Sequence, residues 1–316
     1  MFHQIMSEGN SLSRLRTRIA PTPSGFLHAG NGISFIMTWA IARAFNGSIL
    51  LRIDDLDAQR MRLEYVEDIF RTLDWLGLDY DKGPASPDDF FQNFSQHKRF
   101  HLYAEAIDKL LYSGLLYECR CSRKDIRLHS TNHLYPNTCR EHFLGINADF
   151  INETSWRIRV ENSTLIIFND WQKGQSSVTL DEIIGDFIIQ QKNGLPSYQI
   201  ASLVDDQYFD INFIVRGADL LSSTAAQIFL AQHIGYSHFA SNIFFHHPLM
   251  VDTEGGKLSK SEGAVALKEW RHTHRSPVEL YQQAATWLNL PSGSIKSIAH
   301  LGDLVQLLQD TYPRPI

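Results

Sequence analysis

Near its start the sequence carries residues suited to binding phosphate. The run HAGN at residues 28–31 lies between an expected strand at 17–21 and a helix expected from about Gly32. Backbone amides at the start of a helix attract phosphate, and glycine allows a close approach to the backbone. We therefore expect the His28 imidazole and the amides near Gly30 to hold the phosphates of a nucleotide. Taken alone, such a motif is more often a turn that caps a helix.

A second motif, near the end of the sequence, supplies mobile positive charge. KLSKS at residues 257–261 places the ammonium groups of Lys257 and Lys260 in one short segment. Nucleotidyl transfer is catalysed mainly by positioning and charge neutralisation, so a helix start, an imidazole and two lysines suffice as partners for a nucleotide with Mg²⁺. Taken alone, KLSKS is equally consistent with a solvated loop. The two motifs together, in this order and a domain's length apart, favour activation of a carboxylate with ATP.

Composition limits the class of protein. The 316 residues are 43% hydrophobic, which is enough to fill the core of one large domain or of two to three smaller ones. No apolar run is long enough to span a membrane, and the polar residues 1–13 indicate a loose leader rather than a signal peptide. Three cysteines make no disulfide framework, which favours the cytoplasm. Because the net charge is −6, any nucleic-acid partner must be held by local basic patches.

Hydrophobic periodicity predicts an α/β architecture. Strands are expected at 17–21 and 48–53, and between them apolar residues recur at helical spacing over 33–44. Two further amphipathic helices are expected to end at Gly77 and Gly114. In an open parallel sheet built from such units, ligands bind beyond the carboxyl ends of the strands. The HAGN motif follows the first strand, as this rule requires.

The middle of the sequence changes to a pattern typical of antiparallel strands. From Trp156 apolar residues alternate with arginines such as Arg157, and after a turn the apolar run 165–168 follows. Apolar runs return at 187–189 and 243–245, the second leading towards KLSKS. We therefore expect an antiparallel insertion that interrupts the parallel sheet, which then resumes.

Several separated blocks give the sequence a family resemblance. HAGN and KLSKS resemble the two signature motifs of class I aminoacyl-tRNA synthetases. Residues 18–25, 186–206 and 215–220 resemble the corresponding runs of the glutamyl and glutaminyl subclass, and the resemblance covers about residues 14–290. It implies an α/β, Rossmann-type, doubly wound catalytic domain that forms an aminoacyl-adenylate. It also implies that ATP is bound by His28, Gly30, Asn31 and Lys260, and that its reaction is catalysed by His28, Lys257 and Lys260.

This resemblance implies a domain organisation and an amino-acid pocket. The parts are a leader at 1–13, a split Rossmann-type domain at 14–118 and 187–261, an α+β insertion at 119–186 and a small helical cap at 262–316. The pocket residues correspond to Arg18, Thr22, Asp54, Tyr198 and Arg216. Two arginines and one acid match the two carboxylates and the ammonium group of glutamate.

Two of the expected pocket assignments leave alternatives open, and so do two charged residues near the end of the second expected strand. Bacterial glutamyl enzymes have glutamate where this chain has Asp54, and aspartate there resembles the glutaminyl and archaeal-type enzymes. Glutamate is therefore favoured over glutamine mainly by the two arginines. Tyr198 is also consistent with a core aromatic residue, and Arg52 and Asp57 with residues that only pair with neighbouring charges.

All three cysteines fall within residues 119–139, and such clustering indicates a metal site. Cys119, Cys121 and Cys139 offer three thiolates, and a tetrahedral Zn²⁺ needs a fourth ligand. The resemblance to the small glutamyl-queuosine tRNA(Asp) synthetases implies Tyr135, while more ordinary candidates are His129, His133 and His142. Three free thiols are the alternative to a structural metal. The basic residues near the cluster suit tRNA phosphates or form a solvated face: Arg120, Arg123, Lys124 and Arg127.

The length of the chain after KLSKS separates the subfamilies. Full glutamyl-tRNA synthetases carry a large helical anticodon-binding region there, whereas only residues 262–316 follow here. The resemblance is thus closest to the truncated paralogues that glutamylate queuosine in the tRNA(Asp) anticodon, and it implies activation without tRNA. We expect a cytoplasmic monomer, without membrane contact, that uses ATP, L-glutamate and tRNA(Asp). The alternatives are a ligase with another acceptor (the tRNA acceptor end, a protein or a small molecule) and a catalytically silent binding paralogue.

Overall fold

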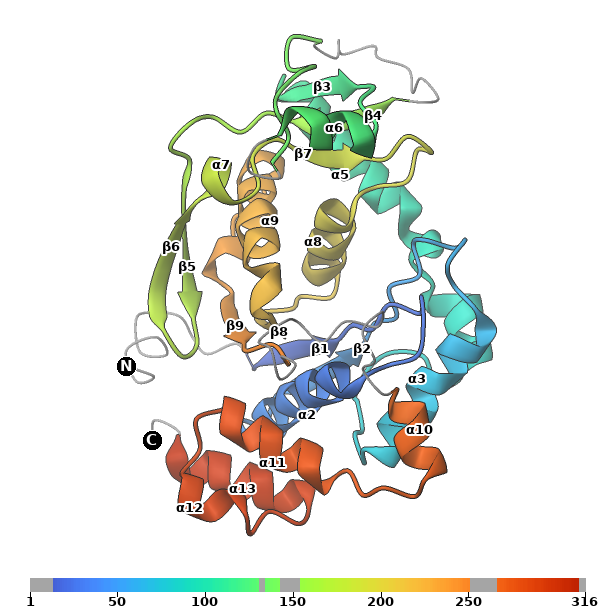
Figure 1. Cartoon of the computed structure of the whole chain (residues 1–316), viewed down its shortest axis with the longest axis vertical. Coiled ribbons are helices and arrows are strands. Elements are labelled where there is room, and N and C mark those ends of the chain that lie inside the picture. The colour runs from blue at the N-terminus through green and yellow to red at the C-terminus, as the bar shows by residue number, and fades with distance from the viewer. Residues whose placement is uncertain (1–13, 131–133, 143–153, 251–265, 313–316) are drawn as a thin grey trace. The chain divides into compact units, whose positions relative to one another are not determined.

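The computed structural model describes residues 14–130, 134–142, 154–250 and 266–312 (Figure 1). Its contacts divide the chain into two compact units, which are described separately. Unit one comprises Met1–Lys98, Ile211–Asp219 and Phe244–Ile316, and unit two comprises Arg99–Asp210 and Leu220–Ile243. The expected leader at 1–13 lies outside the described residues, and the expected domain boundaries stay a prediction.

Unit one begins with the strand–helix–strand unit that periodicity predicts. β1 (Arg16–Ile19) and β2 (Ser48–Leu51) pair in parallel, and α2 (Ala29–Ala44) connects them. β8 (Phe213–Gly217) packs against β1 and lies next to β9 (Ile243–His247). The carboxyl ends of β1, β2 and β8 are therefore grouped in one unit.

Helix α2 starts earlier than its apolar periodicity suggests. We expected it from about Gly32, but it begins at Ala29. His28 adopts an extended conformation as the N-cap residue, and its backbone N–H donates to Asn31 Oδ1 at 3.1 Å. This bond satisfies the backbone at the helix start, so the turn before the first apolar residue is already helical.

Helix α2 is the centre of the core of unit one. Its side chains are buried around most of the helix, as is typical of a helix covered on several sides. The C-terminal helices α11 (Val278–Trp287) and α13 (Leu301–Thr311), drawn in orange and red in Figure 1, pack against it. The remaining helices there are α10 (Leu267–His272) and α12 (Ser292–Ile295). The residues after KLSKS thus form a small helical group.

Helix α3 (Leu63–Trp75) packs against α10. It ends as predicted before Gly77, which has a φ of 70°. The chain then returns through short helical turns, which are α4 (Pro87–Asp89), η1 (Phe90–Phe94) and η2 (Gln96–Arg99).

Unit two contains the antiparallel strands. β3 (Leu116–Cys119), β4 (Ser155–Ile158) and β7 (Phe187–Gln190) form one antiparallel sheet in that order. β5 (Leu165–Asp170) and β6 (Gly174–Thr179) form a hairpin. Our assignment of 187–189 to the resumed parallel sheet is wrong, because β7 pairs with β4. A short apolar run does not reveal the direction of its partner strand.

Three helices of unit two pack against one another: α5 (Phe100–Tyr112), α8 (Tyr198–Tyr208) and α9 (Leu221–Ile234). Unit two also contains the shorter α6 (Arg123–His129), α7 (Leu180–Ile183) and η4 (Phe239–Ser241), while η3 (Ala218–Leu220) begins in the last residues of a unit-one segment. Asp205 on α8 is fully buried and accepts hydrogen bonds from Arg99 at 2.7 and 3.0 Å and from Tyr103 at 2.9 Å. Removing Arg99 would leave the buried Asp205 carboxylate without its charged partner, which is costly in a core. Within the described ranges, no helix combines the length and apolar character that crossing a membrane requires.

Gly83 offers a test of the packing at the end of β2. Its φ is 121°, and a Cβ would lie 2.5 Å from the Leu51 carbonyl oxygen. We expect Gly83→Ala to cost about 3 kcal/mol, because both the backbone conformation and this contact become unfavourable. The control is Gly77→Ala, where a Cβ would meet only Leu301 Cδ1 at 3.3 Å, and we expect it to cost about 1 kcal/mol. Denaturant unfolding followed by circular dichroism compares them, and equal losses would contradict the assigned contact.

Candidate active site

The ends of β1 and β2 bring together residues that are far apart in the sequence. Beyond the strands, the Arg52 N–H donates to the Ile19 carbonyl and the Asp54 N–H donates to the Pro21 carbonyl, both at 2.9 Å. Asp54 therefore lies beside the segment that leads to Thr22, an exposed residue. This is the edge where parallel sheets bind ligands.

Two buried arginines face the same edge from neighbouring strands. Arg18 on β1 is 5% exposed, and its Nη1 donates to the Val215 carbonyl at 3.1 Å. Arg216 on β8 is 4% exposed, and its guanidinium carbon lies 5.5 Å from the centre of the Phe244 ring. Guanidinium groups stay charged even when buried, so the pair places two positive charges in this part of unit one.

Asp54 is held in place by a neighbouring arginine. Arg52 grips its carboxylate with two hydrogen bonds, Nε to Oδ1 at 2.7 Å and Nη2 to Oδ2 at 3.1 Å. The Arg52 side chain is 2% exposed and that of Asp54 10% exposed. Arg52 thus pairs with a neighbouring charge, which was the alternative considered for it. The two-point contact fixes the orientation of the carboxylate that we expected to meet an ammonium group.

The carboxylate of Asp55, the next residue, fixes the start of η2. Its carboxylate accepts the Ser95 hydroxyl at 2.6 Å and the Gln96 backbone N–H at 2.8 Å. The two adjacent carboxylates after β2 therefore have different partners. That of Asp55 caps η2, whereas that of Asp54 binds Arg52.

The start of α2 has the close packing that its glycine permits. A Cβ at Gly30 would lie 3.1 Å from His28 Cε1 and 3.2 Å from its Nδ1. Any side chain at position 30 would therefore press on the imidazole. In the same turn, the Asn31 and Gly32 N–H groups donate to the His28 carbonyl at 2.9 and 3.2 Å. Asn31 fixes the turn through its bond to the His28 N–H. The geometry is that of a helix start suited to phosphate, which every helix N-terminus favours electrostatically.

KLSKS, with Lys257 and Lys260, lies outside the described residues, but the residues that flank this stretch are described. Ala266 pairs with His28 in an antiparallel bridge, and the Leu267 N–H donates to the Leu27 carbonyl at 2.8 Å. On the other side, Met250 Cγ lies 3.9 Å from the position of a Gly30 Cβ. Both flanks of 251–265 are therefore anchored at the start of α2.

His247, at the end of β9, is a residue that the sequence analysis missed. Its Nδ1 lies 2.7 Å from the Pro248 carbonyl oxygen and its Nε2 lies 3.1 Å from Ser34 Oγ. A carbonyl only accepts, so Nδ1 carries the proton and Nε2 accepts from the serine on α2. The ring stacks on Trp287 of α11, with centroids 5.3 Å apart. Burial lowers the pKa of His247, which keeps it neutral and suited to both bonds. The signal available in the sequence was an imidazole directly after an apolar strand.

Tyr198 is the one expected pocket residue that lies in unit two. It is the first residue of α8 and is 41% exposed. This exposure excludes the alternative of a core aromatic residue. Its role in an amino-acid pocket stays a prediction.

The three cysteines converge in unit two. Their sulfur atoms all lie within 4.8 Å of one another, and those of Cys121 and Cys139 are 3.6 Å apart. The Tyr135 hydroxyl lies 3.4 Å from Cys119 Sγ and 3.9 Å from Cys121 Sγ. With Zn–S bonds of about 2.3 Å, two thiolates of a tetrahedral site lie about 3.8 Å apart. Four donor atoms are thus gathered at separations that a metal ion could bridge.

Of the candidate fourth ligands in the described ranges, Tyr135 is the one at the cluster. His129 is exposed, and its Nδ1 lies 2.8 Å from the Asp125 carbonyl oxygen. His142 is also exposed, and neither histidine belongs to the group of clustered donor atoms among the described residues. His133 lies outside the described residues.

The surroundings of the cluster favour ionised thiols at one position and oppose them at another. Burial opposes ionisation of Cys119, but hydrogen bonds from Tyr135 and Arg157 outweigh it and lower the pKa. Burial and the neighbouring Cys139 raise the pKa of Cys121 to about 11. Arg157 is itself buried, with its guanidinium 3.8 Å from the centre of the Tyr135 ring. The alternation in β4 therefore does not expose this arginine, because all of β4 is buried.

The basic residues near the cluster are exposed, as expected. Arg123, Lys124 and Arg127 lie on α6, whose N-cap is formed by Ser122 and Asp125 in a reciprocal capping box. Arg120 precedes them and is also exposed. Their charges are open to solvent or to a partner.

Comparison with known proteins agrees with this geometry. The family described as tRNA synthetases class I (E and Q), catalytic domain, matches residues 14–287. A glutamyl-Q tRNA(Asp) synthetase of Cupriavidus metallidurans is 37% identical over 287 residues, which cover 88% of this chain and 85% of that protein. A glutamate–tRNA ligase of Aquifex aeolicus is 32% identical over 280 residues, which cover 85% of this chain but 56% of that protein.

Structural comparison confirms the expected fold class. The crystal structure of glutamate-tRNA synthetase from Elizabethkingia anophelis superposes with a TM-score of 0.74 at 21% identity, and the match covers 93% of this chain and 65% of that one. This likeness concerns the fold alone, an α/β catalytic domain with a parallel sheet. Together with the sequence match over residues 14–287, it establishes that the chain belongs to the class I tRNA synthetases of the E and Q type.

Proposed function

We propose that this chain activates L-glutamate with ATP and transfers the glutamyl group to queuosine in the anticodon of tRNA(Asp). The observation that carries the proposal is the grouping, in unit one, of two buried arginines and a fixed carboxylate with a glycine-containing helix start. The acceptor is supported by the relative named glutamyl-Q tRNA(Asp) synthetase, which is matched over most of both chains. We also propose that the protein acts as a monomer in the cytoplasm, where ATP and tRNA are found.

Glutamate recognition follows from the charges of the site. Arg18 and Arg216 together offer two positive groups for its two carboxylates, and Asp54 offers an acceptor for its ammonium group. Because Arg52 already holds Asp54 on one side, the ammonium group would approach the remaining lone pairs. Glutamine would place a neutral amide against a buried guanidinium, so the site favours glutamate. The family resemblance adds Tyr198 of unit two to the residues proposed to bind glutamate.

In the first step the glutamate α-carboxylate attacks the α-phosphorus of ATP. A bond forms between carboxylate oxygen and phosphorus, the bond to pyrophosphate breaks, and glutamyl-adenylate remains. Mg²⁺ bound to the phosphates neutralises part of their charge. His28 and the amides of the first turn of α2, with Gly30 and Asn31, would hold the phosphates. Lys260, with Lys257, would neutralise the charge that develops in the transition state.

In the second step a hydroxyl of the queuosine cyclopentenediol attacks the carbonyl carbon of the mixed anhydride. An ester bond forms and AMP leaves. No protein nucleophile is needed, because the adenylate is already activated. The exposed basic residues of α6 would contact backbone phosphates of the tRNA.

We further propose that the cysteine cluster holds a structural Zn²⁺ through Cys119, Cys121, Cys139 and Tyr135. Four protein ligands would leave no open position, which is typical of structural zinc sites. The spacing of the donor atoms supports this assignment. The site would stiffen the sheet next to the basic helix α6.

The proposed reaction is tested by separating its two steps. We expect glutamate-dependent ATP–pyrophosphate exchange without tRNA, since the adenylate pocket is formed by the protein alone. We then expect labelled glutamate to be transferred to tRNA(Asp) that carries queuosine and not to tRNA(Asp) without it. Glutamine in place of glutamate is the control for the pocket. Transfer to tRNA(Glu), or exchange with glutamine instead, would contradict the proposal.

Lys260→Ala tests the proposed charge neutralisation. We expect the kcat of pyrophosphate exchange to fall by about 10²–10³-fold, because the lysine would act mainly on the transition state. The KM for glutamate should change little, since the amino-acid pocket is made by other residues. Lys296→Ala, which removes an exposed lysine, is the matched control. Equal losses in kcat and in glutamate binding would contradict the role assigned to Lys260.

The zinc proposal predicts about one Zn²⁺ per chain, measured by elemental analysis of the purified protein. Cys139→Ser should lose the metal, and Tyr135→Phe should weaken its retention against a chelator. His129→Ala and His142→Ala, the ordinary candidates, are the controls and should retain it. Because thiols must lose their protons to bind Zn²⁺, retention should fall as the pH is lowered. Loss of metal in a histidine variant, with full retention in Tyr135→Phe, would reverse the ligand assignment.

A further inference from the structure

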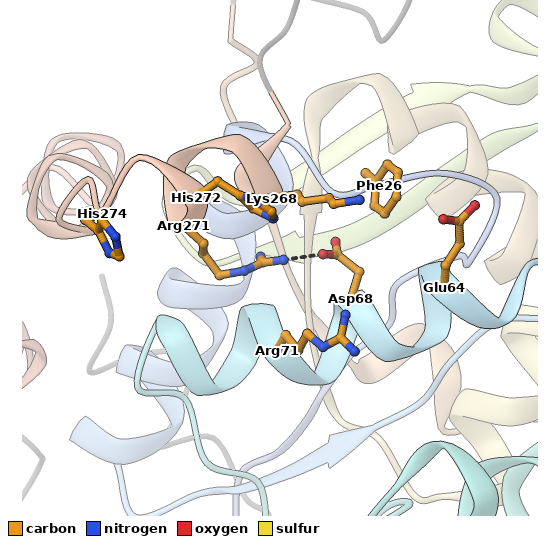
Figure 2. Close-up of a pocket in the computed structure, with 8 residues that line it drawn as sticks. All are labelled: Phe26, Glu64, Asp68, Arg71, Lys268, Arg271, His272 and His274. Atoms are coloured by element: carbon orange, nitrogen blue, oxygen red, sulfur yellow. Dashed lines mark hydrogen bonds and ion pairs between the residues drawn. The ribbon is translucent and has the colours of Figure 1, made fainter.

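Unit one contains a polar cavity that the proposed adenylation chemistry does not use. It lies between α3 and α10 and has a volume of about 490 Å³ (Figure 2). Glu64, Asp68 and Arg71 line it from α3, and Lys268 and Arg271 line it from α10. Its volume is within the usual range of small-ligand pockets, but its walls are charged rather than apolar. An occupant must therefore be recognised by charge.

One cation of the cavity is available to a ligand. Lys268 points towards the ring of Phe26, and its Nζ lies 4.2 Å from the ring centre (Figure 2). Among the described residues, no carboxylate forms an ion pair with this lysine. A cation over an aromatic face is held in place without being neutralised. Lys268 thus keeps its full charge at the edge of the cavity.

A second cation is only weakly engaged. Arg71 Nη2 lies 3.0 Å from the Glu67 carboxylate, with the two side chains 66% and 37% exposed. Exposed pairs of this kind contribute little and exchange partners readily. The imidazoles of His272 and His274 add two more potential donors, and neither makes a side-chain hydrogen bond within the described part of the chain.

The third cation, Arg271, joins the two helices that line the cavity. Arg271 pairs with the buried carboxylate of Asp68, and its Nη1 donates to the Thr72 hydroxyl at 2.6 Å. This contact fixes α10 on α3 and neutralises Asp68. Glu64 is then the one carboxylate lining the cavity that has no partner among the described residues. The cavity offers Lys268, Arg71 and two imidazoles against this single acid.

A tetrahedral oxyanion matches these donors, because it accepts hydrogen bonds in several directions at once. Phe26 and Lys268, which lie together at the cavity, belong to segments that flank the proposed active site. Phe26 is two residues before His28, and Lys268 is two residues after Ala266. An RNA strand whose base is being modified there must carry its backbone past these segments.

We infer that the cavity between α3 and α10 binds a backbone phosphodiester of the RNA substrate. The inference rests on the proposed function, since it needs an RNA partner. The chain carries a net charge of −6, so a local site of this kind is what an RNA requires. The phosphates of ATP have the same chemistry as an RNA phosphodiester. The experiment therefore measures RNA binding and the use of ATP separately.

The test uses three single variants of the full chain. Lys268→Gln removes the available cation, Glu64→Gln removes the opposing charge, and Lys296→Gln is the control at an exposed lysine elsewhere in unit one. Binding of queuosine-containing tRNA(Asp) is measured by filter retention over a series of salt concentrations. ATP–pyrophosphate exchange without RNA is measured in parallel, and it reports on the nucleotide alone.

We expect Lys268→Gln to weaken RNA binding about 3- to 10-fold and to reduce the slope of log K against log salt by about 1, as the loss of one phosphate contact does. Glu64→Gln should change affinity in the opposite direction. Unchanged affinity and slope in both variants would overturn the inference. An increased KM for ATP with unaltered RNA binding would assign the cavity to the nucleotide instead.

Wild-type protein separates this inference from the proposed function. If it fails to transfer glutamate to tRNA(Asp) and binds no RNA, both proposals fail. If it binds and transfers while Lys268→Gln and Glu64→Gln behave like Lys296→Gln, only the cavity assignment fails. Arg271 is not varied, because its loss would leave Asp68 buried without a partner.

Discussion

Burial of charge at the ends of β1, β2 and β8 is the constraint that the rest of unit one satisfies. Arg18, Arg52, Asp54 and Arg216 are all at most 8% exposed. Removing such groups from water is costly unless they are paired, and Arg52 and Asp54 neutralise each other through two hydrogen bonds. Arg18 and Arg216 add two further buried guanidinium groups to this part of unit one. In the proposed function, the two carboxylates of glutamate would pair with these groups.

The C-terminal helices support this edge rather than forming a separate appendage. α11 and α13 pack on α2, and Trp287 stacks on His247 at the end of β9. His247 in turn binds Ser34 on α2, while Ala266 pairs with His28. The chain thus enters and leaves 251–265 beside the helix start that is suited to phosphate.

Sequence alone predicted those parts of the fold that depend on local pattern. The helix α2, the strands β1 and β2 and the end of α3 at Gly77 follow from periodicity and from glycine chemistry. The start of α2 and the partner of β7 did not, because a cap depends on the His28–Asn31 contact and a short apolar run carries no information on strand direction. The pocket arginines came from family resemblance, whereas His247 and the α3–α10 cavity arise from contacts between distant segments that no local pattern encodes.

At the cysteine cluster, the charge of a neighbouring arginine would offset that of the proposed metal site. Three thiolates and a neutral phenol around Zn²⁺ would carry a net charge of −1. Arg157 lies against the Tyr135 ring, is buried, and favours ionisation of Cys119. Its positive charge would offset that of the loaded site, and its Nη1 is tied to the Asp186 carbonyl at 3.0 Å. Arg157 would therefore serve as the counter-charge of a thiolate site. This role would account for an arginine that is buried in β4 although its position in the alternating pattern suggested exposure.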